Sequence, residues 1–368
     1  MSLDDLEAKS GVSRSLIYAY EKGSHIPRAE TVAKLSVALG VEPAFFTMPA
    51  PDPEPAPIFM RHFRSKAGAK FIAAVHRQLP WVRDVVNFIE ECVVLPVVDI
   101  PNFHPPCDPR EVTDSQIEQS STALRRHWGL GDGVIRDVIK LVENKGCIVV
   151  PEIVRCDDID AFSQWSKNGR PFIVANSQKI TGVRWRVDIS HEIGHLVLHR
   201  MIDRRFLEAN PATHRLIENQ AFRFARAFLM PETSFRRSLP HVSLDNLLFA
   251  KRHWHLSVAA MLYRCEDLGM IDRETGIRMW KNLQRRGWKK NEPYDDQLSV
   301  EQPRLLANAI RAIVADDPYH IDELRMRTGL ELTDISRYCG VDQKAITADG
   351  APATLPLIRS NRSTLGLV

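Results

Sequence analysis

Two histidines and a glutamate stand close together in an otherwise apolar segment. Residues 189–199 read ISHEIGHLVLH, so that His191 and His195 are four positions apart and Glu192 follows the first of them. On a helix, residues four apart share a face with Cβ atoms roughly 5 to 6 Å apart, so both imidazoles can reach one metal ion. Glu192 would then take a proton from the water that attacks a peptide carbonyl. This HExxH spacing predicts zinc-dependent peptide hydrolysis.

A solvated helix face with two hydrogen-bonded histidines is the alternative interpretation of this pattern. The apolar residues around the motif argue against it, because they predict a buried helix. They are Ile189, Ile193, Leu196 and Leu198. A third histidine, His199, lies four residues further along the same face, but its spacing does not fit the three-histidine metzincin pattern. We therefore expect His199 to pack beside or support the site rather than bind the metal.

A third protein ligand is expected from the next helical segment, residues 214–232. Its apolar residues recur at helical spacing and predict a buried face. They are Ile217, Ala221, Phe224, Ala225 and Phe228. Glu218 borders this face, and a buried carboxylate is costly without a cation, so Glu218 is the candidate ligand. Helix geometry alone allows almost equally well a glutamate that extends to solvent.

The composition describes an ordinary globular chain of 368 residues, with 44% hydrophobic residues, 26% charged residues and a mean hydropathy of −0.22. No apolar run approaches the roughly 18 residues needed to cross a bilayer, and the N-terminus lacks a signal pattern, so we expect a cytoplasmic protein. Six cysteines without a CxxC pair predict reduced packing thiols rather than disulfides or a cysteine zinc site. A net charge of +3 permits nucleic-acid binding without requiring it.

Proline and polar segments divide the chain into predicted domains. Residues 48–57 (MPAPDPEPAP) contain five prolines, which forbid a helix and predict a semi-rigid linker. We expect a small helical domain over 1–47, an α+β domain over 58–290, and a mostly helical domain over 291–368 that ends in a poorly ordered tail. The polar segment 289–303 marks the softer second boundary. The fold class expected is α+β, mostly helical.

The first domain has the pattern of two short helices joined by a tight turn. Gly11 is suited to the turn because glycine adopts a positive φ without steric cost, and Ser13 can cap the second helix. Arg14, Ser15 and Tyr18 then face outward near the start of that helix, where a recognition helix meets base edges. These residues and Ser13 are the candidate DNA contacts. A helical docking module fits the same pattern about as well.

Residues 2–46 resemble the phage-repressor-like (XRE, or Cro/CI-type) helix-turn-helix family, and the resemblance implies DNA binding. Members normally have a further helix before the segment that begins here at Ser2, where this chain has only Met1. Asp4, Asp5 and Glu7 add negative charge that repels phosphate. We therefore expect weak DNA binding by residues 1–47.

The C-terminal domain repeats this pattern. Residues 321–341 overlay residues 3–23 without a gap, with five identities. These are Asp4/Asp322, Leu6/Leu324, Gly11/Gly329, Ile17/Ile335 and Tyr20/Tyr338. The pattern predicts a second helix-turn-helix-like unit. The acidic Glu331 and Asp334 near the start of its second helix favour protein docking over DNA binding.

Residues 110–290 resemble the ImmA/IrrE (DUF955) metallopeptidase family, through the segment around HEIGH and the following IENQAFRFARAFLMP. The resemblance implies a zincin-like fold, with Zn²⁺, or alternatively Mn²⁺, held by His191, His195 and Glu218 and with Glu192 as general base. In zincins the strand beside the active-site helix binds the peptide substrate as an added strand. The segment PFIVAN is the candidate for that strand, and its candidate substrate contacts are Phe172, Ile173, Val174, Ala175 and Asn176.

Members of this family, including those fused to an XRE domain, are associated with cleavage of repressor proteins. The resemblance thus implies an endopeptidase that cuts a repressor or antitoxin-like protein and so controls transcription. The alternative is a DNA-binding regulator in which the zincin domain acts as a sensor or docking module. The complete set of ligands and general base favours the peptidase, since a scaffold would not need the base.

Overall fold

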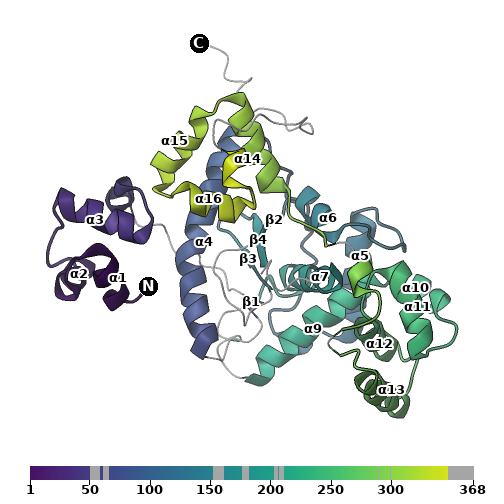
Figure 1. The fold of residues 1–368 in the computed structure, drawn as a ribbon. Coiled ribbons are helices and arrows are strands. Elements are labelled where there is room, and N and C mark those ends of the chain that lie inside the picture. The colour runs from purple at the N-terminus through teal and green to yellow at the C-terminus, as the bar shows by residue number, and fades with distance from the viewer. Residues whose placement is uncertain are drawn as a thin grey trace. The chain divides into compact units, whose positions relative to one another are not determined.

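Helices dominate the structure, a computed structural model, and a small sheet completes it (Figure 1), which confirms the α+β, mostly helical fold. The structure describes residues 1–49, 59–60, 66–151, 161–175, 182–202, 206, 211–289, 291–298 and 300–346. None of the helices in those ranges has both the length and the apolar character needed to span a bilayer.

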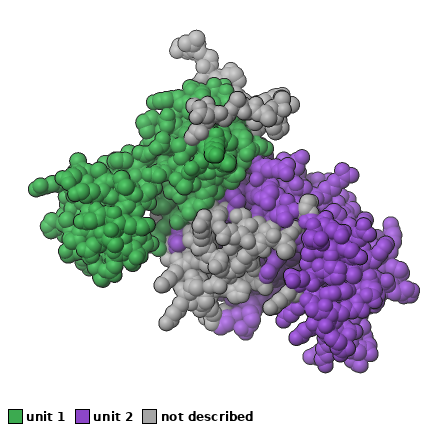
Figure 2. All heavy atoms as spheres, viewed as in Figure 1, with its two compact units in different colours: residues 1–53, 75–95, 306–368 green, residues 54–74, 96–305 purple. Residues whose placement is uncertain are grey.

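The chain forms two compact units (Figure 2). Unit 1, in green, comprises Met1–Pro53, Val75–Leu95 and Leu306–Val368. Unit 2, in purple, comprises Glu54–Ala74 and Pro96–Leu305. The long helix α4 (Lys66–Cys92) contributes residues to both. The domain limits expected from the sequence stay predictions.

Unit 1 begins with a compact set of short helices. They are α1 (Leu3–Ser10), α2 (Arg14–Glu21), α3 (Ala29–Leu39) and the 3-10 helix η1 (Pro43–Thr47). Ser2 and Asp5 form a reciprocal capping box at the start of α1, as their spacing suggests. Ile17 and Leu6 lie in the small buried core, and Gly11 makes the turn at a φ of 69°. The two-helix pattern of the sequence is thus confirmed.

The C-terminal helices of unit 1 repeat the helix–turn–helix arrangement seen at Gly11. They are α14 (Leu305–Asp316), whose first residue belongs to unit 2, α15 (Tyr319–Thr328), α16 (Leu332–Cys339) and the 3-10 helix η5 (Gln343–Ala345). Thr328 Oγ1 donates to the Leu324 carbonyl (2.7 Å) and accepts from the Leu330 N–H (3.4 Å). Ser10 Oγ makes the corresponding bonds to the carbonyl of Leu6 (2.6 Å) and the N–H of Val12 (3.2 Å). Both helices end at a glycine with positive φ, so the predicted echo is present in three dimensions. The predicted tail beyond residue 346 lies outside the described residues.

Unit 2 packs helices against a mixed sheet. Its helices are η2 (Pro109–Glu111), α5 (Asp114–His127), α6 (Val138–Asn144), α7 (Gly182–Leu198), α9 (Pro211–Leu229), α10 (Glu232–Ser238), α11 (Leu244–Trp254), α12 (Val258–Asp267), α13 (Arg273–Arg285) and η4 (Asp295–Gln297). Its strands are β1 (Phe59–Met60), β2 (Ile148–Val150), β3 (Ala161–Trp165) and β4 (Pro171–Ala175), in the order β1-β3-β4-β2. β4 is antiparallel to β3 and parallel to β2.

β4 is an inner strand, which contradicts the prediction that PFIVAN offers an open edge to a substrate. Ile173 is in register with Ser163 of β3 on one side and with Val149 of β2 on the other. The side chains of Phe172, Ile173 and Val174 are buried in the core. Asn176 lies outside the described residues. The prediction was wrong because a short apolar run suits an inner strand as well as an edge, and strand order is not encoded locally.

The segment that follows α13 is held in unit 2 by buried carboxylates. Glu292 accepts hydrogen bonds from Lys251 Nζ (2.8 Å) and from the N–H of Val258 at the start of α12 (2.8 Å). Glu301 pairs with Arg186 of α7 and accepts from the N–H of Val138 at the start of α6 (2.7 Å). Residues 291–298 and 300–305 are therefore held within unit 2 by several contacts.

Candidate metal centre

Helices α7 and α9 pack side by side and carry the candidate site (Figure 1). The apolar residues predicted to bury them do so: Ile189, Ile193, Leu196, Ile217, Ala221, Phe224 and Phe228 are all at most 1% exposed. Gly194 allows the helices to approach closely, because a Cβ at this position would lie 3.0 Å from the Ala221 carbonyl oxygen. Burial of both helices thus fixes the side chains that project between them.

The three predicted ligands come together. His191 Nε2 and His195 Nε2 lie 3.0 Å apart, and each lies 3.3 Å from a carboxylate oxygen of Glu218. All three residues are buried, and Phe222 packs against the His191 ring with centroids 4.0 Å apart. Two imidazoles and a carboxylate are a donor set that suits zinc, and their convergence fits one divalent cation.

The electrostatics of Glu218 agree with a buried cation site. Burial raises the pKa of Glu218, but the adjacent imidazoles of His191 and His195 outweigh this and hold the pKa well below its usual range. An ionised carboxylate between two imidazoles presents the charge that a cation requires. The geometry therefore favours the ligand interpretation of Glu218 over one that extends to solvent.

Glu192 is buried beside this cluster. Its side chain is 3% exposed, and its Oε2 atom has no hydrogen-bond partner among the described residues. Burial raises the pKa of Glu192 well above its usual range; Ser163 opposes the shift, and the charge of Glu218 adds to it. Ser163 Oγ also donates to the backbone carbonyl of Glu192 (3.4 Å), which ties α7 to β3.

Sequence reasoning missed two residues of this site. One is Gly194, whose only sequence signal is its place between the two histidines, on a helix that must pack closely. The other is Gln220, a fully surrounded polar residue (4% exposed) two positions after Glu218. Gln220 contacts His199, and His199 contacts His195, one of the candidate ligands.

The predicted DNA contacts gather at one shallow hollow of unit 1. Ser13, Arg14, Ser15 and Tyr18 line it together with Leu3 and Glu7. Arg14 pairs with Asp4 (2.8 Å), and both side chains are exposed. Ser13 is the N-cap residue of α2, but its side chain makes no capping hydrogen bond, contrary to the prediction. Its hydroxyl contacts Ser15 Oγ (3.3 Å) instead. Their role in DNA binding stays a prediction.

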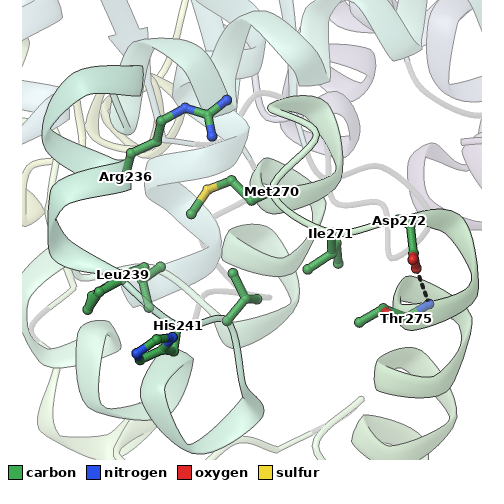
Figure 3. Close-up of a pocket in the computed structure, with 9 residues that line it drawn as sticks. Arg236, Leu239, His241, Met270, Ile271, Asp272 and Thr275 are labelled. Carbon is green, nitrogen blue, oxygen red and sulfur yellow. Dashed lines mark hydrogen bonds between the residues drawn. The ribbon is translucent and has the colours of Figure 1, made fainter.

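A further hollow in unit 2, shown in Figure 3, is lined by residues of the segments 236–242 and 270–275. It includes none of the candidate metal ligands. Asp272 accepts a hydrogen bond from the N–H of Thr275 (2.7 Å; dashed in Figure 3), where it caps α13.

Two family models match the chain. Residues 143–266 match a peptidase family (M78) described as the IrrE N-terminal-like domain, and residues 1–46 match a helix-turn-helix family. No curated protein matches the chain significantly. Both resemblances seen in the sequence are confirmed: the chain joins an XRE-type helix-turn-helix domain to an IrrE/ImmA-like domain of metallopeptidase type.

Proposed function

We propose that the protein is a zinc-dependent endopeptidase that cleaves a transcriptional repressor or antitoxin-like protein and so controls gene expression. The observation that carries the proposal is the convergence of His191, His195 and Glu218 from two buried helices. Glu192 stands beside them on α7. The match of residues 143–266 to a peptidase family supports the same chemistry.

The roles of the side chains follow from their chemistry. His191, His195 and Glu218 would hold the cation, which polarises a water molecule and the scissile carbonyl when it is bound. Glu192 accepts the proton of the attacking water and passes it to the leaving amine. A substrate that pairs with the sheet has to do so at β1 or β2, the outer strands of the described sheet.

A DNA-binding regulator that uses the zincin domain as a sensor is the second candidate. The helix-turn-helix match over residues 1–46 favours it. The two candidates differ in one respect: only the peptidase needs Glu192, because a sensor that merely binds metal or a partner can do so through the three ligands.

The experiment combines metal analysis with proteolysis by the full chain. We expect one divalent metal per chain, and cleavage of a helix-turn-helix repressor encoded by a neighbouring gene at a single site, found by mass spectrometry. His191→Ala is the control and should lose metal and cleavage together. Stoichiometric zinc at another site, or retained metal in His191→Ala, contradicts the ligand assignment. Full metal occupancy without cleavage of any such repressor supports the sensor.

A further inference from the structure

We infer that Gln220 is a positioning residue that acts through His199 to fix the tautomer of His195, so that the lone pair of His195 Nε2 faces the metal site. The inference rests on the proposed function only in taking His195 as a metal ligand. The chain of contacts runs from two backbone carbonyls through Gln220 and His199 to His195.

The orientation of the Gln220 amide is set by its surroundings. Its Nε2 atom donates to the carbonyl oxygens of Pro109 (2.7 Å) and Val112 (3.2 Å), on either side of the end of η2. Carbonyl oxygens only accept, so the NH₂ group must face them. The amide oxygen of Gln220 is thereby turned toward the ring of His199.

The tautomer of His199 follows from that oxygen. His199 Nε2 lies 3.1 Å from Gln220 Oε1, which can only accept, so Nε2 must carry the proton. A neutral imidazole carries one N–H, which leaves His199 Nδ1 as an acceptor. His199 Nδ1 lies 2.9 Å from His195 Nδ1.

The tautomer of His195 follows in turn. Because His199 Nδ1 accepts, His195 Nδ1 must donate, and the lone pair of His195 is then on Nε2. That atom faces His191 Nε2 (3.0 Å) and Glu218 Oε1 (3.3 Å), the other candidate ligand atoms. Each link of the chain is buried, with His195 at 1%, His199 at 0% and Gln220 at 4% exposure.

Helix α9 thus serves the site twice. It supplies Glu218 as a ligand, and two residues later it supplies Gln220, which orients the opposite ligand on α7. Histidine ligands are commonly oriented by carboxylates or backbone carbonyls, and loss of such partners typically costs about 10- to 100-fold in metal affinity. An imidazole and an amide do this here without placing a second negative charge beside Glu218.

The test uses the full chain and Zn²⁺ alone, with affinity measured by competition with a chromophoric chelator. Gln220→Met keeps the length of the side chain but removes its amide, and His199→Phe removes the acceptor for His195. Both should weaken Zn²⁺ binding by about 10- to 100-fold. His199→Asn can place an amide oxygen near the former Nδ1, so it should restore affinity to within a few-fold of wild type. Thr328→Val removes a buried hydroxyl hydrogen bond far along the chain and should leave Zn²⁺ affinity unchanged.

A second readout is the ¹⁵N spectrum of the histidines in the metal-free protein. We expect His199, the ring that Gln220 contacts, to carry its proton on Nε2 in the wild type and to become a mixture of tautomers in Gln220→Met. Wild-type affinity in Gln220→Met, or an Nδ1–H tautomer for His199 in the wild type, overturns the inference. Neither readout involves proteolysis. If the chain cleaves no repressor, the proposed function is wrong, but the tautomer and the Zn²⁺ affinity still test this inference.

Discussion

Gly194 of α7 lies against Ala221 of α9 so closely that a Cβ on the glycine would stand 3.0 Å from the Ala221 carbonyl oxygen and 3.1 Å from its Cα. The glycine stands between His191 and His195, and Ala221 follows Glu218 by three positions. The spacing of the candidate ligands thus depends on the absence of a side chain at Gly194.

Gly194→Ala is expected to push the two helices apart and weaken Zn²⁺ binding. Alanine in a helix normally stabilises a protein by about 1 kcal/mol relative to glycine. Here we expect the free energy of unfolding to fall by about 1–3 kcal/mol instead, because the added methyl group overpacks the helix contact. Chelator competition and denaturant unfolding measure the two effects. Gly276→Ala in α13 is the matched control, because its Cβ would meet only the movable end of Glu266. Unchanged affinity in Gly194→Ala would show that the site tolerates a wider helix spacing.

Glu192→Gln should separate chemistry from metal binding. The amide has nearly the size of the carboxyl group but cannot accept the proton of the attacking water. Cleavage should therefore fall by about 10²- to 10⁴-fold, while metal content and the thermal midpoint stay near wild type. The initial rate of repressor cleavage and the zinc content of the same sample check this. Cleavage at the wild-type rate would exclude Glu192 as the general base.

The stability of the protein should depend on pH through Glu143 of α6. Its carboxylate accepts the N–H groups of Arg304 and Leu305 (both 3.0 Å). Burial nevertheless raises the pKa of Glu143 from 4.5 to about 7, with a smaller contribution from Asp137. Because the folded protein holds this proton more tightly than the unfolded chain, the stabilisation is complete below about pH 4.5 and is lost as the pH rises through about 7.

Glu143→Gln should flatten this decline. The amide oxygen can still accept from the two N–H groups but carries no titrating proton. The difference in free energy of unfolding between variant and wild type should change by about 1–3 kcal/mol in favour of the variant between pH 5 and pH 8. Denaturant unfolding at four pH values across this range measures it. Parallel curves for the two proteins would contradict the assignment.

DNA binding by the full chain should be weak and limited by acidic residues of α1. Asp4 pairs with Arg14, one of the candidate contacts. Asp4→Asn should tighten binding to duplex DNA at low salt, because it removes a negative charge and leaves Arg14 available to phosphate. Glu30→Gln makes the same change of charge on α3, where Glu30 pairs with Lys34, and should have less effect. Fluorescence anisotropy across a salt series checks this; a nanomolar, sequence-specific wild-type complex would show the expectation to be wrong.

Local patterns in the sequence predicted the parts of the site that depend on one helix at a time. The spacing of His191 and His195 and the apolar face around Glu218 are properties of single helices, and burial of both helices brought the ligands together. The position of β4 could not be predicted this way, because strand order depends on partners distant in sequence. Gln220 escaped notice for the same reason: its role depends on the carbonyls of Pro109 and Val112.

The polar stretch between α13 and α14 has the composition of a domain boundary, yet several buried contacts hold it in place. Glu292 and Glu301 each hold the first N–H groups of a helix, α12 and α6 respectively, and Glu143 holds the start of α14 in return. If the backbone were cut near residue 298, the contacts of Glu301 and Glu143 would still hold residues 300–305 to the rest of unit 2. The cut protein would give two bands in denaturing gel electrophoresis and a single peak in size-exclusion chromatography under native conditions. The segment therefore does structural work inside unit 2: it caps two of its helices with buried carboxylates and is itself held at Leu305.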